Sequence, residues 1–112
     1  MKLLTKEIVK RLPGLYSTEH IPLADKIVQA KFFTPWTSWT WYPIEYDPVE
    51  RVFFGYVVGH ESEFGNFALD ELLAVRGPGG LGIERDLHFQ PKRLGNLLES
   101  AELRTQGEGG KE

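Results

Sequence analysis

The stretch that decides the predicted fold is residues 38–59, Ser-Trp-Thr-Trp-Tyr-Pro-Ile-Glu-Tyr-Asp-Pro-Val-Glu-Arg-Val-Phe-Phe-Gly-Tyr-Val-Val-Gly. Its first part, residues 38–46, alternates with a period of two and places Trp39 and Trp41 on the same face of a strand. Its last part, residues 51–59, is almost wholly apolar, which is typical of a central strand buried on both faces. Residues 47–50 between them are of hairpin length, so we expect the two strands to pair antiparallel.

The flanking sequence adds strands and helices to this pair. Residues 27–34 are largely apolar and residues 83–89 alternate, so both segments are predicted to be strands. Three apolar stripes have helical spacing, at Leu4, Ile8 and Leu12, at Leu69, Leu72 and Leu73, and at Leu94, Leu97, Leu98 and Ala101. We therefore predict an α+β domain in the order αβββαβα, an antiparallel meander of three to four strands with about three short helices packed on it.

The length and composition favour one cytoplasmic domain. The chain has 112 residues, which suits a single domain at residues 1–103, followed by a polar tail at residues 104–112 that we expect to be disordered. The absence of cysteine excludes disulfides, thiolate zinc sites, iron–sulfur clusters and cysteine nucleophiles. No apolar run is long enough for a membrane-spanning helix, and charges interrupt the N-terminal apolar run too early for a signal peptide.

Charge is distributed unevenly along the chain. Residues 1–34 hold six Lys or Arg against three acids, a net of +3, whereas residues 35–75 hold one base against seven acids, a net of −6. The second segment also contains most of the aromatic residues. Surfaces that bind single-stranded nucleic acid interleave aromatic rings with cations, and here the two are largely separate. Nucleic-acid binding is therefore disfavoured but stays a third hypothesis, carried by Lys2, Lys6, Lys10, Arg11 and Lys31.

One group of residues could bind a metal ion or perform acid–base chemistry. Glu84, Asp86 and His88 are two residues apart, so in a strand they would leave the same face. With Glu61 and Glu63 they would form a cluster able to bind a divalent cation. The simpler interpretation, which the sequence favours, is the solvent-exposed face of an amphipathic strand.

Other catalytic patterns are not present in the sequence. The loop Gly77-Pro-Gly-Gly-Leu-Gly82 lacks the Gly-Lys-Ser/Thr ending of a phosphate-binding loop and follows a predicted helix, where glycine is expected as a cap. No Gly-x-Ser-x-Gly pattern marks a nucleophilic serine. These observations lean against an enzyme.

The aromatic residues are the strongest indication of binding. Of 14 Phe, Trp and Tyr residues, 12 lie within residues 32–67. A domain of this size is expected to bury about two of its three tryptophans fully, so at least one should be accessible. Most should form the core, while others could stack a flat ligand or anchor a protein partner. Among the tryptophans we expect Trp36 to be accessible. The predicted binding residues are Trp36, Trp39, Trp41, Tyr46, Glu45 and Asp47.

Several linked motifs resemble one bacterial family, the domain of unknown function 2958. They are Lys31-Phe-Phe33, Ser38-Trp-Thr-Trp-Tyr42, Glu45-Tyr-Asp47, Phe53-Phe-Gly55, Val57-Val-Gly59, Arg76-Gly77, Gly80-Leu-Gly-Ile-Glu-Arg-Asp86 and His88-Phe89. The resemblance implies a single-domain protein of plasmids, conjugative elements and phages, with no established activity and no catalytic residues to carry over. It further implies a role in which small proteins antagonise host defence or help to maintain the element.

The leading functional hypothesis is a non-enzymatic accessory protein that contacts a protein partner through an aromatic and acidic surface and needs no cofactor. The alternative is a metal-dependent hydrolase of a phosphodiester or nucleotide, with Glu84, Asp86 and His88 in the catalytic role and a divalent metal as cofactor. A membrane partner is not expected, and the sequence leaves the oligomeric state open.

Overall fold

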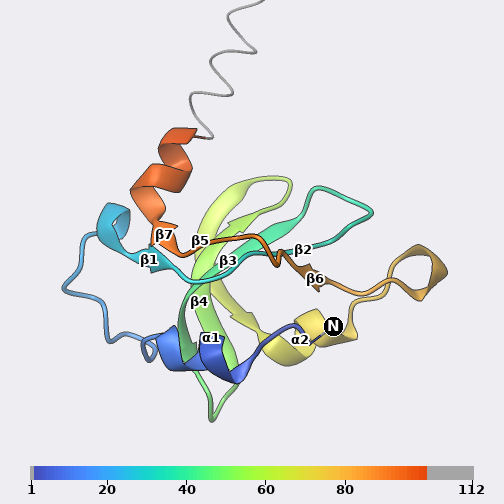
Figure 1. Cartoon of the computed structure of the whole chain (residues 1–112), viewed down its shortest axis with the longest axis horizontal. Coiled ribbons are helices and arrows are strands. Elements are labelled where there is room, and N and C mark those ends of the chain that lie inside the picture. The colour runs from blue at the N-terminus through green and yellow to red at the C-terminus, as the bar shows by residue number, and fades with distance from the viewer. Residues whose placement is uncertain (1, 101–112) are drawn as a thin grey trace, which may run out of the picture.

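The computed structural model describes residues 2–100 and shows an α+β architecture (Figure 1). Within this range the main sheet has five antiparallel strands in the order β5-β4-β3-β2-β6. Their bounds are β2 (Phe32–Phe33), β3 (Thr40–Asp47), β4 (Val52–Val58), β5 (Ser62–Ala68) and β6 (Glu84–Arg85). A separate two-stranded sheet pairs β1 (Ile27–Val28) with β7 (Lys92–Arg93).

Short helices complete the fold. The α-helices are α1 (Lys6–Arg11) and α2 (Leu69–Ala74), and residues 94–100 are also helical. Two 3-10 turns lie at η1 (Leu23–Asp25) and η2 (Pro78–Gly80). Thr5 caps α1, because its hydroxyl oxygen accepts a hydrogen bond of 3.2 Å from the Ile8 amide. No helix in the described part of the chain is long and apolar enough to cross a membrane.

The β3–β4 hairpin forms as the sequence predicts. The carboxylate of Asp47 accepts a hydrogen bond of 2.9 Å from the amide of Val49, which closes the turn after β3. Arg51 ends the turn with φ at 59°, a left-handed conformation that non-glycine residues rarely adopt. Its carbonyl accepts the Leu69 amide at 2.9 Å and so joins this turn to the start of α2.

A β-bulge in β3 changes which side chains face each side of the sheet. The pairing shifts between Pro43, opposite Gly55, and Glu45, opposite Phe54, and this leaves Ile44 as the extra residue. Tyr46 therefore pairs with Phe53 and shares the face of Trp41, although strict alternation would place it with Tyr42. Proline suits this position because a bulge interrupts the regular ladder of hydrogen bonds.

Each face of the sheet has its own core. One cluster buries Phe32, Tyr46 and Phe53 together with Ile8 of α1 and Leu69 of α2. Figure 1 shows α1 and α2 near each other at the same end of the sheet. The other buries Val28, Ile44 and Leu94 and receives partly buried rings of β3 and β4. The expectation of helices packed on the sheet is confirmed, but they are divided between the two faces.

The order and strand count differ from the prediction in four places. Residues 27–34 form two short strands that belong to different sheets. Between them the backbone amide of Gln29 donates to the Pro43 carbonyl at 3.0 Å. The strand β5 was not expected, since Gly65-Asn66 resembles a turn; in the fold Gly65 pairs with Gly55 in mid-strand. Only Glu84–Arg85 of residues 83–89 is a strand. The sequence predicts that Pro91 opens the last helix, but Lys92–Arg93 pairs with β1 and the helix begins at residue 94. The expected tail at residues 104–112 lies outside the described residues.

Candidate functional site

A surface hollow of about 460 Å³ brings together residues from two of the predicted sites. It lies at the β2–β6 side of the sheet, and we call it the Trp39 hollow. It is defined here by Lys31, Phe33, Trp39, Glu84, Asp86 and Leu87. His88 also lines it. One residue of the predicted aromatic surface thus shares a concavity with all three residues of the predicted acid–base group.

The hairpin between β2 and β3 and two neighbouring groups position Trp39. The Trp39 amide donates to the Thr37 hydroxyl at 3.2 Å, and its carbonyl accepts the Thr34 amide at 3.1 Å. The Trp39 ring stacks on Trp41 with a centroid distance of 5.9 Å and meets the edge of His60 at 5.7 Å. Gly59 lets the ring approach closely, because a Cβ atom there would overlap it. These contacts fix the half-buried Trp39 ring against Trp41 and His60, and Trp39 is also one of the residues that line the hollow.

The acid–base group sits on a turn rather than on one continuous strand. After β6, the Asp86 carboxylate accepts the His88 amide at 2.9 Å, and this hydrogen bond closes a turn at residues 87–88. The other Asp86 oxygen lies 3.9 Å from Lys31 Nζ. Within residues 2–100, the Glu84 carboxylate has neither a hydrogen bond nor an ion pair. Glu84 is therefore the carboxylate of this hollow that can meet an external cation.

The sheet topology separates the two halves of the predicted metal cluster. Glu63 lies on β5 and Glu61 just before it, whereas Glu84 lies on β6, and these strands form opposite edges of the sheet. Four strand spacings of roughly 4.8 Å place the edges about 19 Å apart, too far for shared metal ligands. In the described part of the chain, no group of three or more His, Cys, Asp or Glu side chains could hold a metal ion.

The other tryptophans mainly pack against the protein itself. Trp36, at the tip of the β2–β3 hairpin, lies against Gly77 in the loop after α2, where a Cβ atom would overlap the ring. Its side chain is only partly exposed. Trp41 packs on the core cluster beneath α1 and α2. Trp39 has similar packing contacts, but it also lines the hollow described above.

Two predicted surface residues, Glu45 and Tyr46, are buried, and this corrects their placement. Glu45 is 3% exposed and Tyr46 is 4% exposed, because the loop around Thr18 covers Glu45 and the cluster beneath α1 and α2 contains Tyr46. The Glu45 carboxylate accepts hydrogen bonds from the Tyr16 amide at 2.8 Å, the Thr18 amide at 3.3 Å and the Thr18 hydroxyl. Asp47 is partly exposed, but its carboxylate closes the β3–β4 turn. Glu45 and Tyr46 are therefore not exposed for binding, whereas the binding role of Asp47 stays a prediction.

Comparison with known protein families agrees with the motifs in the sequence. The family model described as "Protein of unknown function (DUF2958)" matches residues 3–106, nearly the whole chain. The chain belongs to the DUF2958 family. No curated protein and no solved structure shows significant similarity to it. The resemblance drawn from the sequence is confirmed, and the family description names neither an activity nor a ligand.

Two residues of the Trp39 hollow, Phe33 and Leu87, are not among the binding residues predicted from the sequence. Phe33 was expected to lie in a core strand, but it lines the hollow. Leu87 was expected on the apolar face of a strand, yet the turn after β6 leaves it 63% exposed. The pattern Asp86-Leu-His88 contained a signal for this turn, because an aspartate side chain commonly accepts the amide two residues later.

The burial of Tyr46 predicts a loss of stability at high pH in the DUF2958 protein. Burial raises the pKa of Tyr46 above its usual value of 10.0, and the nearby Arg51 charge partly offsets the rise. Above that pH the unfolded chain loses the phenol proton first, so the free energy of unfolding falls as pH rises through the raised pKa. Urea unfolding below pH 10 and above the raised pKa should show that the free energy of unfolding falls less in Tyr46→Phe than in the wild type. The exposed Tyr16→Phe should behave like the wild type, and an equal fall in all three proteins would contradict this assignment.

Proposed function

We propose that this DUF2958 protein is a non-enzymatic binding protein whose Trp39 hollow receives an apolar side chain of a protein partner, flanked by a cation. One observation carries the proposal: Trp39, Phe33 and Leu87 line one hollow of about 460 Å³ together with Glu84, whose carboxylate has no hydrogen bond or ion pair within residues 2–100. Interfaces commonly combine buried aromatic anchors with a polar rim. The residues that support binding are therefore fewer than the sequence predicts, and they come from β2, the β2–β3 hairpin, β6 and the turn after it.

The arrangement favours a protein partner over a small metabolite or a metal. Leu87 projects from a turn and is 63% exposed, so a partner that covers it would remove apolar surface from water. Glu84 would pair with a lysine or arginine of that partner at the rim, where charge mainly sets orientation and association rate. The preorganised Trp39 ring needs little further ordering on binding, which lowers the entropic cost of association.

We further propose that the partner belongs to a bacterial defence system and that this protein acts in the cytoplasm as an accessory of a mobile genetic element. The support is the sequence resemblance, which places related small proteins on plasmids, conjugative elements and phages. The partner recognised by the Trp39 hollow would then be a host protein.

Substitutions in the hollow test the proposed binding. Immobilised full-length protein should retain a host protein from a bacterial lysate, and quantitative mass spectrometry identifies it. With the purified partner, Trp39→Ala should weaken binding about thirtyfold, because truncating a central aromatic anchor costs about 2 kcal/mol or more. Leu87→Ser and Glu84→Gln should weaken it less.

An exposed leucine outside the hollow provides the matched control. Leu23 in η1 is 47% exposed, so Leu23→Ser makes the same chemical change as Leu87→Ser and should leave affinity unchanged. A partner that binds Trp39→Ala and Leu87→Ser as tightly as the wild type would remove the hollow from the interface. A partner with no role in defence would refute the biological half of the proposal while leaving the binding site intact.

A further inference from the structure

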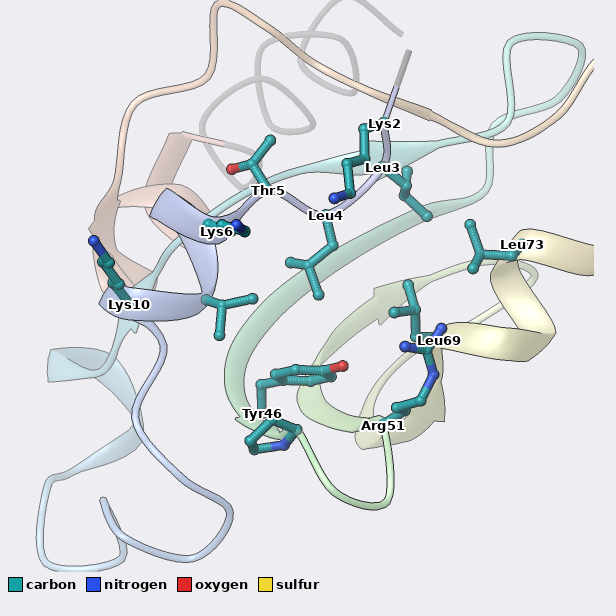
Figure 2. Close-up of a pocket in the computed structure, with 12 residues that line it drawn as sticks. Lys2, Leu3, Leu4, Thr5, Lys6, Lys10, Tyr46, Arg51, Leu69 and Leu73 are labelled. Carbon is teal, nitrogen blue, oxygen red and sulfur yellow. The ribbon is translucent and has the colours of Figure 1, made fainter.

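A second, larger concavity lies between α1 and α2, on the core cluster that contains Tyr46 and Phe53 (Figure 2). Its volume is about 540 Å³, and we call it the α1–α2 groove. Leu4, Tyr46 and Leu69 form its apolar floor, and Leu73 of α2 forms one wall (Figure 2). Leu73 is 43% exposed, so α1 and α2 leave part of this apolar surface uncovered. The Trp39 hollow shares none of its lining residues with this groove, and of the predicted binding residues Tyr46 alone is among the residues that line it.

The rim of the α1–α2 groove is positively charged. Lys2, Lys6 and Lys10 line it on the side of α1, and Arg51 lies across from them beside Leu69 (Figure 2). No Asp or Glu side chain is among the described residues that line the groove. Arg51 is already paired, because its Nη2 lies 2.8 Å from Asp70 Oδ1. Within residues 2–100 none of the three lysines has an ion pair, so together they favour an anionic partner.

The spacing of the lysines on α1 predicts how far apart the acidic side chains of a partner should lie. Lys6 and Lys10 are four residues apart on α1, which places their positions about 6 Å apart along the helix axis. Ile8 on the same helix faces the core. A partner helix with acidic side chains every fourth residue would present its charges at the same interval, and its apolar side chains could enter the groove between α1 and α2.

We infer that the α1–α2 groove binds an acidic amphipathic helix of a protein partner. Apolar side chains of that helix cover Leu4, Leu69 and Leu73, and its carboxylates meet Lys2, Lys6 and Lys10. The helix becomes a third helical element on this face of the sheet, beside the two short ones that the chain supplies itself.

The apolar floor favours a helix over nucleic acid. Nucleic-acid grooves combine cations with exposed aromatic faces on which bases stack. Here Tyr46 supplies the ring of the floor and is 4% exposed, while the remaining floor is aliphatic. Phosphate contacts to the lysines alone would leave this aliphatic surface uncovered, whereas an amphipathic helix satisfies both parts of the groove.

Selection from a displayed peptide library tests this inference without a known partner. Full-length protein is the bait, and the library consists of helical peptides of about four turns, roughly 14 residues. We expect enriched sequences to carry Asp or Glu at positions i and i+4 beside Leu or Phe. The double variant Lys6→Glu/Lys10→Glu should bind the selected peptides at least about tenfold more weakly, and added salt should weaken wild-type binding.

Control variants separate this site from the Trp39 hollow and from general charge effects. Lys92→Glu changes a lysine that lies over the Phe89 ring, outside the groove, and should leave peptide affinity unchanged. Trp39→Ala should also leave it unchanged, so failure of the proposed function and failure of this inference give different results. Leu73→Ser alters an exposed wall and should weaken peptide binding without reducing its dependence on salt.

The inference fails if the selection enriches no peptide, if enriched peptides lack acidic residues, or if the double variant binds them as tightly as the wild type. A duplex DNA oligonucleotide, followed by fluorescence anisotropy at low salt, gives the competing outcome. Binding of this DNA that is lost in Lys6→Glu/Lys10→Glu, together with a selection that yields no peptide, would assign the groove to nucleic acid and overturn the proposal.

Discussion

Replacement of Glu45 by alanine should lower the free energy of unfolding by about 3–5 kcal/mol, a large part of the stability of a domain this size. Glu45 is buried on β3 and connects that strand to the N-terminal loop. The Thr18 hydroxyl donates to the Glu45 carboxylate and accepts from Lys26 Nζ at 2.7 Å. Lys26 is also buried, at 7% exposure. Removing the carboxylate therefore leaves a buried ammonium group without its nearby counter-charge.

The same substitution also releases backbone groups of the loop. The amides of Tyr16 and Thr18 both donate to Glu45, and Tyr16 adopts a left-handed conformation with φ at 66°. Unpaired buried amides are costly, and the strained Tyr16 backbone would lose the hydrogen bond that holds it. We therefore expect the loop at residues 14–22 to lose its attachment to β3 in Glu45→Ala.

Chemical unfolding measures this effect, with Glu50→Ala as the matched control. Glu50 lies in the exposed β3–β4 turn, and its replacement should change stability by about 0.5 kcal/mol or less. Thr18→Val should also destabilise the protein, because it removes the hydroxyl bridge and keeps both charges. Equal stability of Glu45→Ala and Glu50→Ala would show that the buried network contributes nothing.

The second large effect is expected for Gly55→Ala, at about 3 kcal/mol of lost stability. Gly55 lies opposite Pro43 at the bulge between β3 and β4. An added Cβ would overlap the Tyr42 carbonyl oxygen and lie 3.0 Å from both Tyr42 C and Pro43 Cα. These are backbone atoms in the central part of the sheet, so relief requires the strands to separate rather than a side chain to rotate.

Gly65 provides a close control for Gly55. The two glycines are paired across β4 and β5, but a Cβ at Gly65 has no atom within 4 Å. Gly65→Ala should be neutral or stabilising by up to about 1 kcal/mol, because alanine loses less backbone entropy on folding. Thermal and urea unfolding of the two variants should therefore change in opposite directions or differ by several kcal/mol. Similar losses in both would show that the approach of Tyr42 does not limit this position.

Local sequence patterns predicted the elements in which neighbouring residues decide the structure. The β3–β4 hairpin follows from an alternating segment, an apolar segment and a turn at Asp47-Pro48. The helix α2 follows from Leu69 and Leu72, which both become buried. β5 could not be predicted in this way, because its central Gly65-Asn66 has the composition of a turn and is a strand only through pairing with β4.

The candidate sites depended on contacts that are distant in sequence. A single bulge at Ile44 exchanged the faces of Glu45 and Tyr46, and alternation along the strand contains no signal for that exchange. The Trp39 hollow requires the pairing of β2 with β6, which places Phe33 opposite Glu84. The acidic residues of β5 lie far from those of β6, because the order of the strands in the sheet sets the distance between them and spacing in the sequence does not.

Family motifs, periodicity and turn chemistry are local properties, so they predict the family, the α+β class, the central hairpin and the aromatic core. Three features appear only in the folded chain: Trp39 lines a hollow with Glu84 and Leu87, Glu45 is buried, and Lys2, Lys6 and Lys10 surround an apolar groove floored by Tyr46 and Leu69. The physical reason is that strand order, register and helix packing bring these residues together, and these depend on the whole chain at once.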